Sequence, residues 1–214
     1  MADRVCIAVI DSGVFPAHPH IDAARLLPGI MIMPDGTIEA GPGATLDRLG
    51  HGTAVTAAIQ ELAPHADILP VRVFREALRA SALALTTAIT WAAGHGAAVI
   101  NCSLGTTNPA HAALFDAAVA HAKAHIVAPM SGPDGAPCWP GQCAGVIRVG
   151  LDRDLPRGTV RVIDGVHHAC GYPRPIPGVD PRRNLHGISF ATAQVSGWVA
   201  GGLVNASGTP FPAV

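Results

Sequence analysis

The sequence predicts one α/β domain, built on a single doubly wound, mostly parallel sheet with helices on both faces. Three observations support this fold class. Apolar runs of strand length alternate with helical patterns, the helical segments are rich in alanine, and no repeat or low-complexity linker divides the chain. With 214 residues, 49% hydrophobic and 14% charged, the chain can bury one substantial core and is too apolar to be disordered. We therefore expect one domain over residues 1–214.

The expected elements alternate along the chain. Short apolar runs predict buried strands at 5–10, 67–73, 97–101, 126–129 and 146–149. Helical patterns predict helices at 53–62, 81–93, 110–124 and 190–203. Right-handed crossovers between parallel strands place such helices on both faces of the sheet. Residues 151–186 are rich in Pro, Gly and Arg and predict a surface hairpin and loop, with possible short strands at 159–163 and 166–169.

The charge balance excludes several classes of partner. Fourteen Lys and Arg against fifteen Asp and Glu give a formal net charge of −1, which offers neither a nucleic-acid surface nor a polybasic membrane patch. The N-terminus lacks the charged segment and long apolar stretch of a signal peptide, and its apolar run is too short to span a membrane. Five scattered cysteines fit a reducing compartment. We expect a cytoplasmic protein without nucleic-acid or membrane partners.

Three glycine-flanked motifs contain residue types suited to nucleophilic catalysis. Asp11 follows the first expected strand, His51 lies between two glycines at a helix start, and Ser189 precedes the last helix. Each has a simpler interpretation when taken alone. Asp11 could be a turn residue or a metal ligand, His51 a cap or surface residue, and Ser189 a helix N-cap. A single motif therefore indicates little.

Together the three motifs predict a catalytic triad. A serine hydroxyl becomes nucleophilic when a histidine accepts its proton, and a carboxylate fixes the tautomer of that histidine and stabilises its cation. The chain supplies the three groups in the order Asp, His, Ser, one of the known orders for such triads. We expect Asp11, His51 and Ser189 to meet at the carboxyl edge of the sheet.

These motifs resemble those of the subtilisin family of serine peptidases. Residues 9–14 (VIDSGV), 51–53 (HGT) and 187–191 (GISFA) match the family's Asp, His and Ser motifs, and 99–105 (VINCSLG) resembles its substrate-binding strand. The similarity extends from about residue 5 to residue 204 and implies a subtilisin-like fold. It implies that Ser189 attacks the scissile carbonyl, that His51 carries the proton and that Asp11 orients His51.

The resemblance also assigns a substrate site. Ser103, Leu104 and Gly105 would pair with an extended peptide through their backbones, and Gly132 would also belong to the substrate site. The backbone N–H of Ser189 would be one donor to the oxyanion.

The second oxyanion donor is where the sequence departs from the family pattern. The family places an asparagine where this chain has Pro133, which has no N–H. Asp134 or Ser131 would have to serve instead, and Gln142 is a further candidate. The loss of one donor typically lowers the rate about 10²–10³-fold.

No cofactor or metal is expected. No Asp/Asn-rich calcium loop is present in the sequence. Cys138 and Cys143 could form a disulfide, supply half of a metal site or pack in the core. Asp11 lies ten residues after Met1, so we also expect no inhibitory prodomain.

The predicted function is that of a serine endopeptidase with narrow specificity for a precursor or leader peptide. Modified polypeptide precursors are among the substrates that we consider. The chain is similar in size and layout to the short maturation proteases that remove leader peptides, the branch that acts in quinohemoprotein amine dehydrogenase maturation among them. Two other functions fit the same residues. One is a pseudo-peptidase that binds peptides without cleaving them, and the other is an esterase or amidase.

Overall fold

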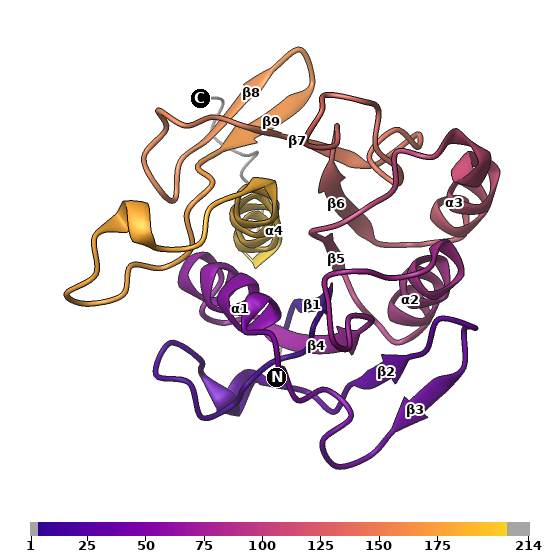
Figure 1. Cartoon of the computed structure of the whole chain (residues 1–214), viewed down its shortest axis with the longest axis horizontal. Coiled ribbons are helices and arrows are strands. Elements are labelled where there is room, and N and C mark those ends of the chain that lie inside the picture. Colours follow the sequence, from indigo (N-terminus) through magenta and orange to yellow (C-terminus); the bar gives the residue numbers. More distant parts are fainter. Residues whose placement is uncertain (1–3, 205–214) are drawn as a thin grey trace.

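The structure, a computed structural model, describes residues 4–204. One mixed sheet forms its centre (Figure 1). Its strands are β1 (Cys6–Asp11), β2 (Ile30–Ile32), β3 (Ile38–Ala40), β4 (Asp67–Arg72), β5 (Val99–Cys102), β6 (His125–Pro129), β7 (Ile147–Leu151), β8 (Val160–Ile163) and β9 (Val166–Ala169). The helices are α1 (His51–Leu62), α2 (Ala82–Gly94), α3 (Ala112–Ala120) and α4 (Ile188–Val204), with short 3₁₀ turns at Ala23–Arg25, Pro109–His111 and Pro181–Arg183.

The strand order is β3-β2-β4-β1-β5-β6-β7-β9-β8. In this order, every pair of neighbours from β2 to β9 is parallel. At the two edges of the sheet, β3 pairs with β2 and β8 pairs with β9 in antiparallel orientation. The order reverses direction at β1, from which the chain winds first to one side and then to the other. The predicted doubly wound, mostly parallel α/β fold is confirmed.

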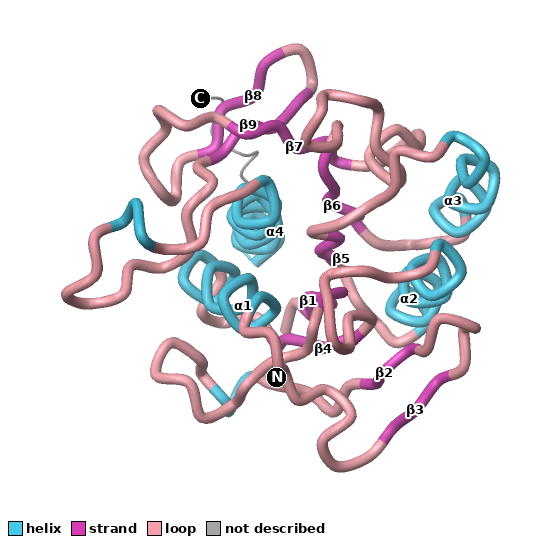
Figure 2. Tube along the Cα trace, viewed as in Figure 1, coloured by secondary structure: helices cyan, strands magenta, loops and turns pink. Residues whose placement is uncertain are grey.

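The helices form two layers. Helices α1 and α4 pack against each other on one face of the sheet, and α2 and α3 cover the other face (Figure 2). Each strand residue faces one layer or the other because side chains alternate along a strand. In β1, Ile7 and Val9 belong to the core beneath α1 and α4, whereas Ala8 and Ile10 belong to the core beneath α2 and α3. All four are almost completely buried.

Two short strands escaped the sequence analysis, and one helix is shorter than expected. Strands β2 and β3 have three residues each. Ile30 and Ile32 of β2 are buried in the core, but this apolar run is short, and all three residues of β3 are exposed. Helix α3 ends at Ala120 because the chain must turn back to enter β6 at His125. The predicted hairpin at 159–169 is present, and its second strand also joins the sheet beside β7.

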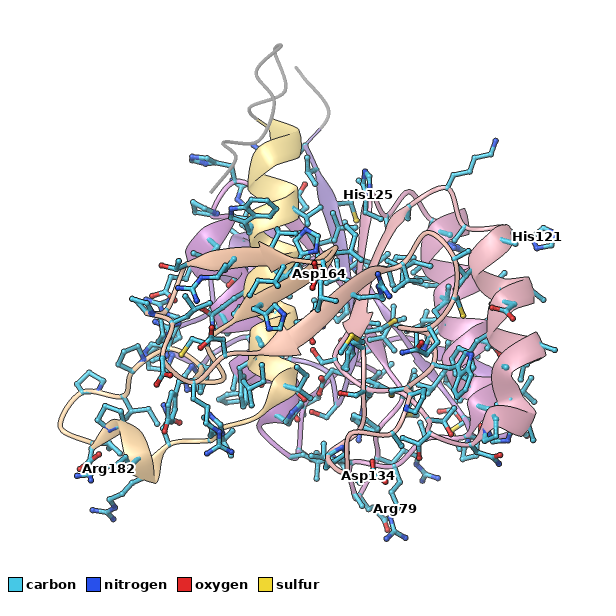
Figure 3. The ribbon with its side chains drawn as sticks, turned by 90° about the horizontal axis from the view of Figure 1, so that it is seen from above. Arg79, His121, His125, Asp134, Asp164 and Arg182 are labelled. Carbon is cyan, nitrogen blue, oxygen red and sulfur yellow. The ribbon has the colours of Figure 1, made fainter. Side chains whose placement is uncertain are left out.

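The carboxyl ends of the strands gather at one edge of the molecule. Figure 3 labels His125, the first residue of β6, at one end, and Asp134, in the loop after that strand, at the other. Asp11 ends β1 at this carboxyl edge, and α1 and α4 both begin near it, as the contacts of His51 and Ser189 show below. The architecture therefore brings the three predicted motifs toward one edge of the sheet.

Candidate active site

Asp11 and His51 form the best-defined contact of the site. Asp11 is the last residue of β1 and is fully buried, and His51 is the first residue of α1. The Nδ1 atom of His51 lies 2.7 Å from Oδ1 of Asp11, which also accepts a 2.7 Å hydrogen bond from the Ser12 N–H. When Nδ1 carries the proton and donates to the carboxylate, Nε2 is left as the proton acceptor.

The surroundings of His51 set its proton affinity. Its side chain is only 14% exposed, and this burial by itself disfavours the imidazolium. The hydrogen bond and charge of Asp11, together with the charge of Asp47, outweigh burial and raise the pKa of His51 above its ordinary value. The site therefore stabilises the cation that His51 would become after taking a proton from serine.

Asp47 is a functional residue that the sequence analysis missed. Its buried carboxylate accepts hydrogen bonds from the Ser12 hydroxyl, from the N–H groups of Leu49 and Gly50, and from both the N–H and the hydroxyl of Thr53, at 2.6–2.9 Å. Burial opposes its ionisation, but these hydrogen bonds hold the pKa of Asp47 below its ordinary value. Because the N-cap residue Gly50 has no side chain, Asp47 accepts from the Thr53 N–H in its place, and the Ser12 hydroxyl accepts from the Gly52 N–H.

The glycine after His51 is required by close packing. A Cβ atom on Gly52 would lie 2.2 Å from the carbonyl oxygen of Gly13 and 3.1 Å from Oδ1 of Asp11. The Gly52 N–H also donates to the Ser12 hydroxyl at 2.8 Å. The start of α1 can thus approach the end of β1 closely enough for His51 to reach Asp11.

Ser189 lies at the start of α4, where a reciprocal pair of hydrogen bonds fixes it. Its hydroxyl donates to the Ser103 carbonyl at 3.0 Å, and the Ser103 hydroxyl donates to the Ser189 carbonyl at 3.1 Å. The buried Asn101 donates to the Ser103 hydroxyl and accepts from Ser196 of α4. The Ser189 hydroxyl proton is therefore directed to the Ser103 carbonyl.

His51 and Ser189 line the same cavity, of about 330 Å³, here called the active-site cavity. The predicted substrate residues Ser103, Leu104, Gly105 and Gly132 line it too. Its other lining residues are mainly apolar: Phe74, Leu78, Thr107, Pro129, Ser131, Pro133, Cys138 and Ile188. The structure thus brings the predicted nucleophile, base and substrate segment to one place, with Asp11 directly behind the base.

The structure separates the candidates for the second oxyanion donor. Ser131 and Pro133 line the active-site cavity, whereas Asp134 does not. Asp134 is exposed at the rim of the molecule (Figure 3), and its carboxylate accepts a hydrogen bond from the Ala136 N–H at 3.2 Å. Gln142 donates its side-chain amide to the Met130 carbonyl at 2.6 Å and also lies outside the cavity lining. Ser131 is therefore the candidate that the geometry favours.

The cysteines are all free thiols. The disulfide considered for Cys138 and Cys143 is not present, and burial raises the pKa of these thiols to about 11 and about 12. Cys143 packs in the core, whereas Cys138 lines the active-site cavity, which the sequence analysis did not anticipate. Within residues 4–204, no cluster of three or more His, Cys, Asp and Glu side chains is placed to hold a metal ion, and no helix is long and apolar enough to cross a membrane.

Comparisons with known proteins show what the chain resembles. It is 28% identical over 218 residues to the alkaline protease of Alkalihalobacillus alcalophilus, covering 92% of this chain and 53% of that protein. The chain spans about half the length of the alkaline proteases it matches.

Two solved structures share the fold across most of the chain. The prenylagaramide maturation protease PagA has a TM-score of 0.68 at 27% identity, with 94% of this chain and 75% of that chain covered. The nisin leader peptidase NisP from Lactococcus lactis has a TM-score of 0.69 at 20% identity, with 92% and 76% covered. The expected subtilisin-like fold is confirmed.

The model of the Subtilase family matches residues 2–151, more than half of the chain, and this match includes Asp11 and His51. Ser189 lies beyond the matched range, but the likeness to the alkaline protease extends over 92% of the chain. The chain therefore belongs to the subtilase family.

Proposed function

We propose that this protein is a serine endopeptidase in which Asp11, His51 and Ser189 form the catalytic triad. The observation that carries the proposal is the 2.7 Å contact between His51 and the buried Asp11, made beside a cavity that Ser189 also lines. Membership of a family of serine peptidases supports it.

In the proposed mechanism, the Ser189 oxygen attacks the scissile carbonyl carbon while its proton passes to Nε2 of His51. Asp11 stabilises the resulting imidazolium through the bond to Nδ1. His51 then returns the proton to the leaving amine as the C–N bond breaks, which leaves an acyl group on Ser189. Attack by water, again with His51 as base, releases the acid and restores the serine.

The oxyanion would be held by two donors from different segments. One is the Ser189 N–H, which belongs to the first turn of α4, where backbone amides have no intrahelical acceptor. The other is the hydroxyl of Ser131, which takes the part that the family gives to an asparagine. This role is supported by the place of Ser131 in the cavity lining, to which Pro133 also belongs.

We further propose that the natural substrate is a precursor or leader peptide, modified polypeptides included, and that specificity is narrow. Support comes from two neighbours whose names describe such work, the leader peptidase NisP and the maturation protease PagA. The five free thiols suit the cytoplasm, where we place the protein. The quinohemoprotein amine dehydrogenase branch stays a prediction of the sequence.

Incubation with casein and with a diverse peptide library, followed by mass spectrometry, tests the proposal. We expect cleavage of few library members, slow or no digestion of casein, and no cleavage by Ser189→Ala. Rapid, general digestion of casein would contradict narrow specificity. Cleavage that survives in Ser189→Ala would contradict the triad.

A peptide-binding pseudo-peptidase is the second candidate. It is favoured by Pro133 at the family's asparagine position and by the hydrogen bond that turns the Ser189 hydroxyl to Ser103. If the protein is a pseudo-peptidase, the unmodified protein should retain bound peptides intact. An enzyme predicts that the same peptides are cut by the unmodified protein and retained only by Ser189→Ala.

A further inference from the structure

A second cavity, of about 480 Å³, is lined by residues that neighbour those of the active-site cavity in the sequence. At the start of α1, the N-cap residue Gly50 lines the second cavity and His51 the first. At the start of α4, Leu185 in the preceding loop lines the second cavity and Ile188, the first residue of the helix, lines the first. The two cavities therefore follow each other across the same two segments. An extended peptide advances about 3.3 Å per residue, so a few residues beyond Ser189 would be enough to cover the width of such neighbouring segments.

We propose that this second cavity, here called the arginine cavity, binds an acidic segment of the peptide substrate at some distance from the scissile bond. Arg48, Arg174 and Arg183 would hold its carboxylates. The inference rests on the proposed function, because it assigns a further subsite to the same peptide.

The charges of the lining residues support an anionic ligand. Within residues 4–204, no carboxylate pairs with Arg48 or Arg183, and both residues are exposed. Arg174 lies 3.8 Å from Glu61, which also pairs with Arg157, so this negative charge is shared by two arginines. Guanidinium groups can bind carboxylates through two parallel hydrogen bonds.

No acidic side chain competes for these arginines from within the cavity lining. Asp47 is the one carboxylate among the lining residues, and its oxygens already accept five hydrogen bonds from Ser12, Leu49, Gly50 and Thr53. The lining of the cavity is therefore positively charged. Arg48 and Arg183 are available to a ligand, whereas Arg174 also contacts Glu61 and donates to the His20 carbonyl.

The rim of the arginine cavity carries apolar side chains that a free inorganic anion would not use. Phe15, Ile176 and Leu185 line the cavity and are 46%, 46% and 49% exposed. Large apolar groups gathered at a surface hollow are typical of a binding surface. A peptide segment that mixes acidic and apolar residues matches both properties.

Binding of a defined probe to Ser189→Ala tests the proposal without requiring catalysis. The probe is a fluorescein-labelled octapeptide of alternating Glu and Leu, with the Gln-Leu octapeptide as its neutral counterpart, followed by fluorescence anisotropy. We expect the Glu peptide to bind about five- to twentyfold more tightly at low salt, a preference of the size that a few partly exposed ion pairs supply. The preference should shrink in 1 M salt because the charges are then screened.

Arginine variants locate the preference. Replacing Arg48 and Arg183 together by Ala should remove most of it, whereas Arg182→Ala should leave it unchanged. Arg182, labelled in Figure 3, is a matched control. It lies on the same 3₁₀ turn as Arg183 but pairs with Asp180, and it is not among the residues that line the cavity. Equal binding of the two peptides, or an equal loss in the Arg182 variant, would overturn the proposal.

Two further measurements separate the possible causes of any result. Binding of the Glu peptide is also compared between its C-terminally amidated and free-acid forms. We expect equal affinity, because the side-chain carboxylates are bound. Binding of the free-acid form alone would show capture of the chain terminus and would contradict the proposal. Hydrolysis of a small activated ester by the unmodified protein reports on the triad alone, and the control variant Arg182→Ala should hydrolyse it at the unmodified rate. Failure of ester hydrolysis would count against the proposed function, and failure of the peptide preference against the arginine cavity.

Discussion

The imidazole of His51 lies against Asp11 and within the field of Asp47, so two carboxylates set its proton affinity. His51 acts as a base in its neutral form, and its pKa is raised. We therefore expect kcat/KM to fall as the pH drops through a value above the ordinary histidine pKa of about 6.5. The pH profile of ester hydrolysis measures this value. If the midpoint of the acidic limb of this profile lies well below pH 6.5, the carboxylates do not raise the pKa of His51 as described.

The raised pKa of His51 also makes the stability of the fold depend on pH, in the opposite direction to catalysis. Because the folded state raises the pKa of His51, its contribution to the free energy of unfolding is complete below the unfolded pKa. That contribution is lost as the pH rises through the folded pKa. Catalysis by His51 therefore increases over the pH range in which its stabilising contribution declines.

Ser131 is the second residue whose role can be measured. Replacing it with Ala should lower kcat about 10²–10³-fold with little change in KM, because an oxyanion donor acts on the transition state alone. Asp134→Ala is the matched control from the same loop and should leave kcat nearly unchanged, because Asp134 faces solvent. Equal effects of the two substitutions would remove Ser131 from the oxyanion site.

At the residue scale, the sequence predicts much of the candidate site but not the groups that complete it. Asp11, His51 and Ser189 stand in short glycine-flanked motifs that can be identified locally. Asp47 has no such motif, and its importance comes from folding back onto the start of α1. The choice between Ser131 and Asp134 depends on how the loop after β6 folds, which its Pro- and Gly-rich sequence does not specify.

Among the elements, helix α1 depends on Asp47 for its first turn. Asp47→Asn removes the anion that accepts five hydrogen bonds and should lower the free energy of unfolding by about 2–3 kcal/mol at pH 7. Since the folded state lowers the pKa of Asp47, its contribution is present above the unfolded pKa and is lost as the pH falls through the folded pKa.

Urea unfolding of both proteins between pH 7 and pH 3 checks this prediction. The stability difference should narrow toward low pH. A difference that is constant over the whole range would contradict the role given to the ionised carboxylate.

The elements that the sequence predicts well are those with strong apolar patterns. The strands β1, β4 and β6 and the helices α1, α2 and α4 lie within two residues of their expected bounds. Strands β2 and β3 were missed because they have only three residues each, and pairing with neighbouring strands sets their place in the sheet. Tertiary pairing decides such segments, and a single sequence carries little signal of it.

For the molecule as a whole, we expect the layer of α2 and α3 to contribute to stability and the layer of α1 and α4 to hold the active site. Phe115 of α3 is fully buried in the core under α2 and α3, across the sheet from α1 and α4. Phe115→Ala should lower the free energy of unfolding by about 3–5 kcal/mol, while kcat/KM of the protein that remains folded stays close to that of the unmodified chain.

Leu114 is the matched control on the same helix, since it is 41% exposed. Leu114→Ala should change stability by no more than about 0.5 kcal/mol. Denaturant unfolding and ester hydrolysis at a temperature where both variants are folded provide the measurements. A large loss of activity in folded Phe115→Ala would show that the far layer positions the site, contrary to the account.

The doubly wound topology follows from the alternation of strands and helices, whereas the surfaces around the site do not. The arginine cavity combines residues from two distant segments, Arg48 before α1 and Arg174 and Arg183 in the loop before α4, and only the folded chain brings them together. The sequence shows arginines in a Pro-rich stretch, which is also typical of a solvated loop. The volumes of both cavities likewise depend on loop conformations that have no periodic pattern.

The central claim is that Asp11, His51 and Ser189 act as one nucleophilic unit, and labelling with a fluorophosphonate tests it most directly. The account predicts one covalent adduct per folded chain, located by mass spectrometry on Ser189, and no adduct in His51→Ala or in the denatured protein. No labelling of the native protein, or labelling of Ser189 that persists in His51→Ala, would contradict it.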